Sequence, residues 1–257
     1  MRSPVIAAAG CLGYGVEYAR LVDLRRVGAV VTRTTTLQPR RGTPRLLETP
    51  GGLFCCGPWP NPGLRAVAER YAPVWAGWDT PVILSVAGAD PGEYGQIAGH
   101  ADSIEGVAAL ELCLLDDPAR AAACVRAARA ATQRPLLAKL PALDPEPLAE
   151  LARALVEIGA DALTICPWPQ ALEIDPADGA RLEGRLSGPA LRPLALRLVA
   201  AVAAVSGVPV VGGGGIAGPD DARRFLAAGA SAVQIGAALL ADPELLMMVG
   251  DQEGAGG

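Results

Sequence analysis

The sequence has little of what nucleic-acid-binding and membrane proteins need. Its 257 residues include one histidine, and the 22 lysines and arginines are outnumbered by 27 acidic residues, which gives a net charge of −5. Without an excess of basic residues, we expect no face that binds nucleic acid. No run of about eighteen apolar residues is free of charge, glycine or proline, so we expect no membrane span. These absences favour a cytoplasmic protein that acts on small molecules.

The cysteines lack the spacing of a metal site. They are Cys11, Cys55, Cys56, Cys113, Cys124 and Cys166. With no CxxC pair and with His100 as the one histidine, the sequence predicts no metal site. The N-terminal apolar stretch is too short for an export signal, so we expect free thiols instead of disulfides. His100 falls in a helix-like segment and is interpreted as a surface or packing residue.

Eight short apolar runs alternate with stretches of helical periodicity. The runs are 4–9, 29–33, 81–88, 107–114, 135–140, 161–166, 208–215 and 232–236. This pattern is typical of βαβ units, and eight units in about 250 residues predict a single-domain (β/α)₈ TIM barrel, here over residues 1–249. The polar segment that follows the second run, up to residue 53, is interpreted as a long loop. The Gly-rich end, residues 250–257, predicts a disordered tail.

Glycines and a lysine mark the ends of the predicted strands. A run of four glycines, 212–215, ends the seventh strand, and Gly236 ends the eighth. Barrels often bind a phosphate at these two loops, although a tight turn would also explain the glycines. Lys139 lies in an apolar strand, where a charge is costly unless it is paired. It either pairs with an acid such as Glu111 or faces a bound cofactor.

Five motifs follow one another in the order and spacing of a known family. They are GYGVEY at 13–18, VVTRTTTLQPRRGTPRLLETPGGL at 30–53, NPG at 61–63, LSGPALRPLALRLV at 186–199, and GGGGI at 212–216 with AGASAVQIG at 228–236. In these motifs the sequence resembles the dihydroorotate dehydrogenases, which are barrels that contain FMN. The resemblance extends over nearly the whole chain and implies FMN as the cofactor.

The resemblance also implies which residues hold FMN. Those near the flavin ring are Ala8, Ala9, Gly10, Arg33, Thr34, Thr35, Ser85 and Lys139. Those at the ribityl phosphate are Ser187, Gly188, Gly214, Gly215, Gly236 and Ala237. The family usually has lysine at the position of Arg33, and asparagine at that of Ser85. Lys139 matches the lysine at the N1–C2 edge of the ring, where its charge would stabilise the reduced flavin.

The substrate side departs from the family. Asparagines hold orotate in the family, whereas the corresponding positions here are Cys55, Cys113 and Pro167. Thiols and proline form few of the hydrogen bonds that a pyrimidine carboxylate needs, so we expect a different substrate. Trp59 and Trp168 lie on two of the same loops. They either pack these loops or line an aromatic pocket.

The residue that takes the proton is also different. The family carries a Cys or Ser base in a motif like S-C-P-N after the fourth strand, and this chain has LELCLLDDPARAAAC there. Asp116 and Asp117 are interpreted as a helix cap. The candidate replacements are Cys55, Cys113 and Cys166, with Tyr14 as a weaker candidate. Each cysteine is also explained as an apolar core residue.

The function predicted from the sequence is that of an FMN-dependent oxidoreductase. It would transfer a hydride between a C–C or C–N bond of a small substrate other than dihydroorotate and flavin N5. The alternatives are a genuine dihydroorotate dehydrogenase of pyrimidine biosynthesis, a non-catalytic FMN-binding or assembly subunit, and a flavin-free barrel for a phosphorylated substrate. In the family, homodimers are common and one branch recruits an iron–sulfur electron-transfer subunit, and the sequence decides neither point.

Overall fold

Eight parallel strands form a closed barrel. The structure is a computed structural model that describes residues 3–114, 118–175 and 177–254. The barrel order is β1-β12-β11-β8-β7-β6-β5-β2. The strands are β1 Val5–Ala7, β2 Ala29–Val31, β5 Val82–Val86, β6 Val107–Cys113, β7 Leu136–Lys139, β8 Ala162–Ile165, β11 Val210–Gly213 and β12 Ala232–Ile235. Each strand lies within one of the eight apolar runs, so the predicted (β/α)₈ barrel is confirmed.

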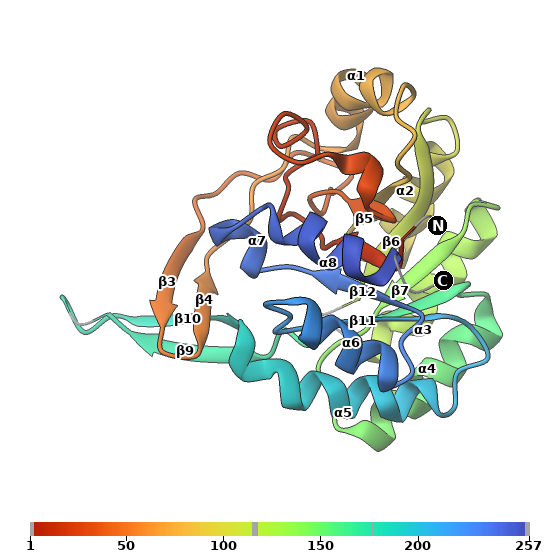
Figure 1. Cartoon of the computed structure of the whole chain (residues 1–257). Helices are drawn as coiled ribbons and strands as arrows, with labels where there is room; N and C mark the ends of the chain where they lie inside the picture. Colours follow the sequence, from red (N-terminus) through yellow and green to blue (C-terminus); the bar gives the residue numbers. More distant parts are fainter. Residues whose placement is uncertain (1–2, 115–117, 176, 255–257) are drawn as a thin grey trace.

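Helices surround the barrel (Figure 1). They are α1 Leu64–Trp75, α2 Pro91–Ala101, α3 Pro118–Ala131, α4 Pro145–Ile158, α5 Arg192–Ala203, α6 Pro219–Ala227, α7 Ala238–Ala241 and α8 Leu245–Gly254, with 3-10 turns η1 Leu24–Arg26 and η2 Pro189–Leu191. Several begin at proline, whose φ suits the first helical turn. At the start of α2, the Asp90 carboxylate accepts the Glu93 N–H at 3.0 Å. In α4, Leu148, Ala152 and Leu155 form one buried stripe.

A second sheet extends from the barrel. It is antiparallel, with the order β3-β4-β10-β9. Its strands are β3 Arg45–Thr49, β4 Gly52–Cys56, β9 Gln170–Ile174 and β10 Arg181–Ser187. Figure 1 shows these strands as an arm on one side of the molecule. The interpretation of the polar segment after the second strand as a long loop was therefore wrong for residues 45–53, which belong to the hairpin of β3 and β4.

The interior of the barrel changes from apolar to polar along the strands. One buried apolar cluster inside it consists of Ile6, Ala29, Val31, Ile83, Ala109, Leu137, Val211 and Ala232. Side chains two residues further along a strand point to the same side. Beyond the apolar cluster, toward the C-terminal ends of the strands, the side chains on this side are Glu111, Lys139, Thr164 and Gln234. All four are buried. The polar groups therefore lie toward the C-terminal strand ends, where barrels place their active sites. We call this end the barrel mouth.

The C-terminal segment differs from the prediction. Helix α8 continues to Gly254, so the backbone is helical well into the segment 250–257 that was expected to be a disordered tail. Residues 255–257 lie outside the described part of the chain. His100 is exposed in α2, as expected for a surface residue. In the described ranges, no helix combines the length and apolar character that crossing a bilayer requires.

Candidate active site

The glycines predicted to hold a phosphate meet at one side of the barrel mouth. Strands β11 and β12 are paired, with Gly213 opposite Gln234, so the loops that follow them are neighbours. Gly214 and Gly215 have φ values of +107° and +82°, in the left-handed region that favours glycine. Gly188, which directly follows β10, lies next to them, because a Cβ atom on Gly215 would lie 2.9 Å from the Gly188 carbonyl oxygen. The three segments thus form one glycine cradle.

The backbone of the cradle has free hydrogen-bond donors. Within the described ranges, no acceptor contacts the backbone N–H groups of Gly188, Gly214, Gly215, Gly236 and Ala237. Backbone N–H groups normally have a partner, and converging unpaired N–H groups form anion sites. The cradle therefore fits the phosphate of FMN.

The residues predicted to lie at the flavin ring also come together. Ala8, Ala9 and Gly10 follow β1, and the Ala8 N–H donates to the Ile235 carbonyl oxygen at 2.8 Å. Gly10 lies beside Arg33, with 3.9 Å between a Cβ atom built on Gly10 and the Arg33 Cα. Thr34 and Ser85 link the ends of β2 and β5 through their hydroxyl groups, 2.9 Å apart. The ends of β1, β2 and β5 thus form the part of the barrel mouth next to the glycine cradle, because β1 pairs with β12.

Lys139 pairs with Glu111, as the sequence suggested. Its Nζ lies 3.6 Å from Glu111 Oε1, and the Glu111 side chain is fully buried. Burial by itself would lower the pKa of Lys139, but the charges of Glu111 and of the Cys166 and Cys113 thiols raise it above its ordinary value. Lys139 therefore keeps its positive charge throughout the physiological pH range.

Four thiols lie at the barrel mouth. Cys113 ends β6, Cys166 follows β8, and Cys55 lies in β4; all three carry thiol groups and are not in disulfides. Burial raises the pKa values of Cys55 and Cys166. Burial also raises the pKa of Cys11 to about 12. The charge of Lys139 lowers this pKa, and those of Cys166 and Cys55 raise it. Cys11 was not among the candidate bases predicted from the sequence, although it lies only four positions after the end of β1. A thiol with a raised pKa keeps its proton at neutral pH. The thiols of Cys11, Cys55 and Cys166 therefore do not readily take a proton there.

The two tryptophans predicted near the pocket pack together. The ring centroids of Trp59 and Trp168 are 6.4 Å apart, and both side chains are half-buried. The Arg185 guanidinium lies 5.5 Å from the centre of the Trp168 ring and donates to the Trp168 carbonyl oxygen at 2.7 Å. This cation–π contact was missed because no local motif marks Arg185, which reaches Trp168 through β10.

Tyr14 belongs to an aromatic cluster. Its ring stacks on Tyr71 at 4.3 Å, and its hydroxyl lies 3.2 Å from Thr35 Oγ1. Burial raises the pKa of Tyr14 from 10.0 to about 12. This makes Tyr14 a poor base at neutral pH.

The raised pKa of Tyr14 predicts a loss of stability at alkaline pH. Between pH 10 and pH 12 the unfolded chain releases the tyrosine proton and the folded chain keeps it, so the free energy of unfolding falls with rising pH. In Tyr14→Phe this fall should be smaller, at a cost of about 1 kcal/mol at neutral pH for the lost hydrogen bond. Urea unfolding at several pH values measures both effects. An equal alkaline fall in the two proteins would contradict this prediction.

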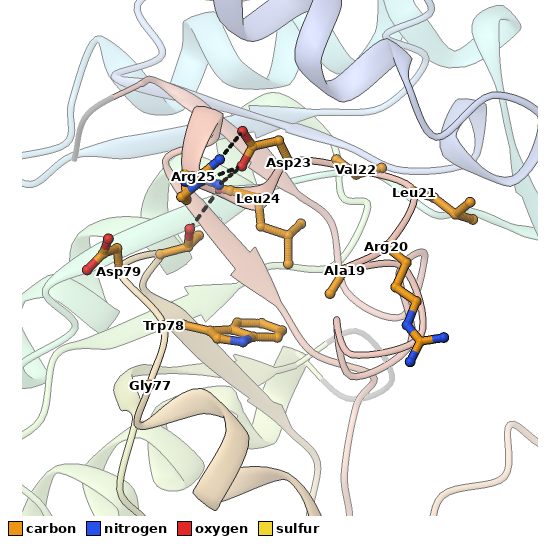
Figure 2. Close-up of a pocket in the computed structure, with 11 residues that line it drawn as sticks. Ala19, Arg20, Leu21, Val22, Asp23, Leu24, Arg25, Gly77, Trp78 and Asp79 are labelled. Carbon is orange, nitrogen blue, oxygen red and sulfur yellow. Dashed lines mark hydrogen bonds and ion pairs between the residues drawn. The ribbon is translucent and has the colours of Figure 1, made fainter.

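One predicted feature falls outside the described residues, and one cavity lies away from the barrel mouth. Asp116 and Asp117, interpreted as a helix cap, are outside the described residues. A cavity of about 510 Å³ is lined by residues 19–25 and 77–80, with the Trp78 indole on one side (Figure 2). Its walls immediately precede β2 and β5, so it lies at the N-terminal ends of these strands. We therefore place the candidate active site at the barrel mouth and not in this cavity.

Comparison with known proteins agrees with this placement. The family model described as dihydroorotate dehydrogenase matches residues 1–252. Proteins of Trichlorobacter lovleyi and Pelobacter propionicus, each named dihydroorotate dehydrogenase B (NAD(+)), catalytic subunit, are 40% identical over 95% of this chain and 86% of their own. The dihydroorotate dehydrogenase of Eimeria tenella, solved with ferulenol, has a TM-score of 0.77 at 16% identity over 97% of this chain and 80% of its own, which supports the fold.

The comparisons confirm the family and the cofactor that the motifs implied. The family model and the relatives together extend over nearly the whole length of the sequence. Members of this family are flavoproteins that use FMN and act on CH–CH bonds. The chain therefore belongs to the dihydroorotate dehydrogenase family of FMN-dependent oxidoreductases.

Proposed function

We propose that the chain oxidises dihydroorotate with FMN, as the catalytic subunit of a two-component enzyme. The observation that carries this proposal is the 40% identity, over 95% of the chain, to relatives with that name. The expectation of a different substrate finds no support in the comparisons, which favour the alternative of a genuine dihydroorotate dehydrogenase.

The barrel mouth supplies the groups that such a reaction needs. The glycine cradle would hold the phosphate through its backbone N–H groups, and the segments after β1 and β2 would lie along the flavin. FMN, when bound, accepts the hydride of the substrate. Lys139 would face the ring, where a fixed positive charge favours the reduced state.

The proton that leaves with the hydride needs an acceptor. We assign this role to the thiols at the barrel mouth, among which Cys113, Cys55 and Cys166 are the candidates, and Cys55 and Cys166 can take the proton only as thiolates. Because burial raises the pKa values of Cys55 and Cys166, a rate that depends on either thiolate would increase with pH into the alkaline range.

The electrons would leave through a second protein. The relatives are named as catalytic subunits of an NAD(+) enzyme, which implies that another subunit passes electrons to NAD⁺. An iron–sulfur electron-transfer subunit fits this role. Formation of a homodimer remains a prediction of the family resemblance.

Anaerobic addition of dihydroorotate to the purified, FMN-loaded protein tests the proposal. We expect the visible absorbance of the flavin to bleach, because the substrate C–C bond supplies the two electrons. A protein without flavin, even after incubation with FMN, would contradict both the cofactor site and the reaction. As the control, orotate is added in the same way. Orotate is the oxidised product and has no hydride to donate, so the flavin should not bleach.

A second candidate function follows from the composition of the pocket. Cys55 is buried in β4 and interacts electrostatically with Cys11, and the resemblance implies an asparagine in the family at the position of Cys55. Trp59 and Trp168 lie on the adjoining loops, and Arg185 contacts Trp168 from β10. This lining fits an oxidoreductase for a flatter, less polar substrate. A yellow protein that dihydroorotate does not bleach would favour this candidate over the first.

A further inference from the structure

A buried hydrogen-bonded cluster lies inside the barrel beside Lys139. Its centre is Glu111 on β6, whose Oε2 accepts the Thr164 hydroxyl at 3.1 Å and the Gln234 side-chain N–H at 2.6 Å. Strands β6, β7, β8 and β12 each contribute one side chain to the cluster. The other carboxylate oxygen, Oε1, faces Lys139 Nζ at 3.6 Å.

The two oxygens of Glu111 have different surroundings. Oε2 has two donors, whereas Oε1 is buried and has no hydrogen-bond donor in the part of the chain that the structure describes. The carboxylate is therefore held from one side and directed at Lys139 from the other. A buried charge of this kind is costly, and an apolar residue would extend the layer that begins with Ala109. The barrel core does not require this acid.

We propose that Glu111 is a positioning residue for the flavin reaction, which holds Lys139 at the barrel mouth and offsets part of its charge. Glu111 would thereby set the redox potential of bound FMN. This inference rests on the proposed function only in placing Lys139 against the flavin. Thr164 and Gln234 fix the carboxylate, so its distance from Lys139 is set by four strands of the barrel.

The charges around Lys139 determine the sign of the effect. The groups that act on it are Glu111, Cys166, Cys113 and Cys11. Removal of the Glu111 charge leaves the full positive charge of Lys139 to act on the flavin, which favours reduction and the addition of sulfite, since both add negative charge. Without Glu111, burial would dominate and lower the pKa of Lys139. Lys139 would then lose its charge as the pH rises, and the stronger binding of sulfite should disappear.

Glu111→Gln in the FMN-loaded protein tests the proposal. We expect the dissociation constant for sulfite, from titration of the flavin absorbance, to fall about tenfold at slightly acidic pH. The midpoint potential should become more positive. The ratio between the dissociation constants of variant and wild type should return toward one at alkaline pH. This ratio cancels the titration of sulfite itself.

Two further variants separate the charge of Glu111 from its packing. Thr164→Val removes one hydrogen bond to Glu111 and keeps its charge, so we expect a smaller change that does not depend on pH. Glu111→Asp keeps the charge but withdraws it from Lys139, so we expect an intermediate sulfite affinity. It also tests the proposal if Glu111→Gln fails to fold.

Two results would overturn the inference. One is an unchanged sulfite affinity and potential in Glu111→Gln and Glu111→Asp, and the other is an equal effect in Thr164→Val. The readouts need bound FMN but no turnover, so failure of dihydroorotate as the substrate would leave the inference intact.

Discussion

Replacement of Lys139 by alanine should slow reduction of the flavin by about 100-fold, comparable to the loss of one preorganised electrostatic donor in other enzymes. Lys139 is the buried cation of the barrel interior, 3.6 Å from Glu111. Its charge is needed most when the flavin gains negative charge, so the rate of reduction should fall more than the affinity for substrate. Rapid anaerobic mixing of the loaded variant with dihydroorotate, followed through the flavin absorbance, measures this rate.

The fold should survive the Lys139→Ala change. Glu111 loses its counter-charge but keeps the hydrogen bonds that Thr164 and Gln234 donate to it. The double variant Lys139→Ala, Glu111→Gln serves as the control, because it removes the lysine without leaving an unpaired acid. If the single and double variants both reduce the flavin at the wild-type rate, Lys139 has no part in the reaction.

Gly215→Ala should weaken the binding of FMN by about 100-fold, which corresponds to the loss of roughly one charge-assisted hydrogen bond. Gly215 has a φ of +82°, and an added Cβ would lie 2.9 Å from both the Gly188 carbonyl oxygen and the Arg192 backbone nitrogen. The side chain would therefore strain the backbone and push the two halves of the glycine cradle apart. Titration of the flavin-free protein with FMN, followed by flavin fluorescence, gives the dissociation constant.

Gly218→Ala is the matched control for this prediction. Gly218 lies three residues further along the same loop, has an extended φ of −175°, and has nothing within 4 Å of an added Cβ. It should bind FMN as the wild type does and keep the same melting temperature. Equal FMN affinity in Gly215→Ala and Gly218→Ala would show that the phosphate does not lie in the cradle.

The barrel was predictable because its signals are local. Each strand is a short apolar run, and most connections include a stretch with the length and periodicity of a helix. The same holds for the glycines at 212–215 and Gly236, which are adjacent to strands that a parallel barrel must place side by side. Motif order then indicated the family, and the comparisons confirmed it.

The second sheet was missed because its pairing is not local. Strand β4 pairs with β3 through a short hairpin but also with β10, which places Cys55 opposite Arg185, 130 positions later in the chain. Its strands alternate polar and apolar residues only briefly, between prolines and glycines that suggest a loop.

By itself the sequence determined the barrel, the position of its mouth, the family and the set of residues proposed to hold FMN, because these depend on periodicity and on motifs within single segments. Only the tertiary structure decided how those segments act on one another. It placed Gly188 against Gly215, Arg185 over Trp168, and the Thr164 and Gln234 side chains on the carboxylate that faces Lys139. Such contacts depend on barrel closure and strand register, which bring side chains from distant strands to one level, and no local pattern in the chain encodes them.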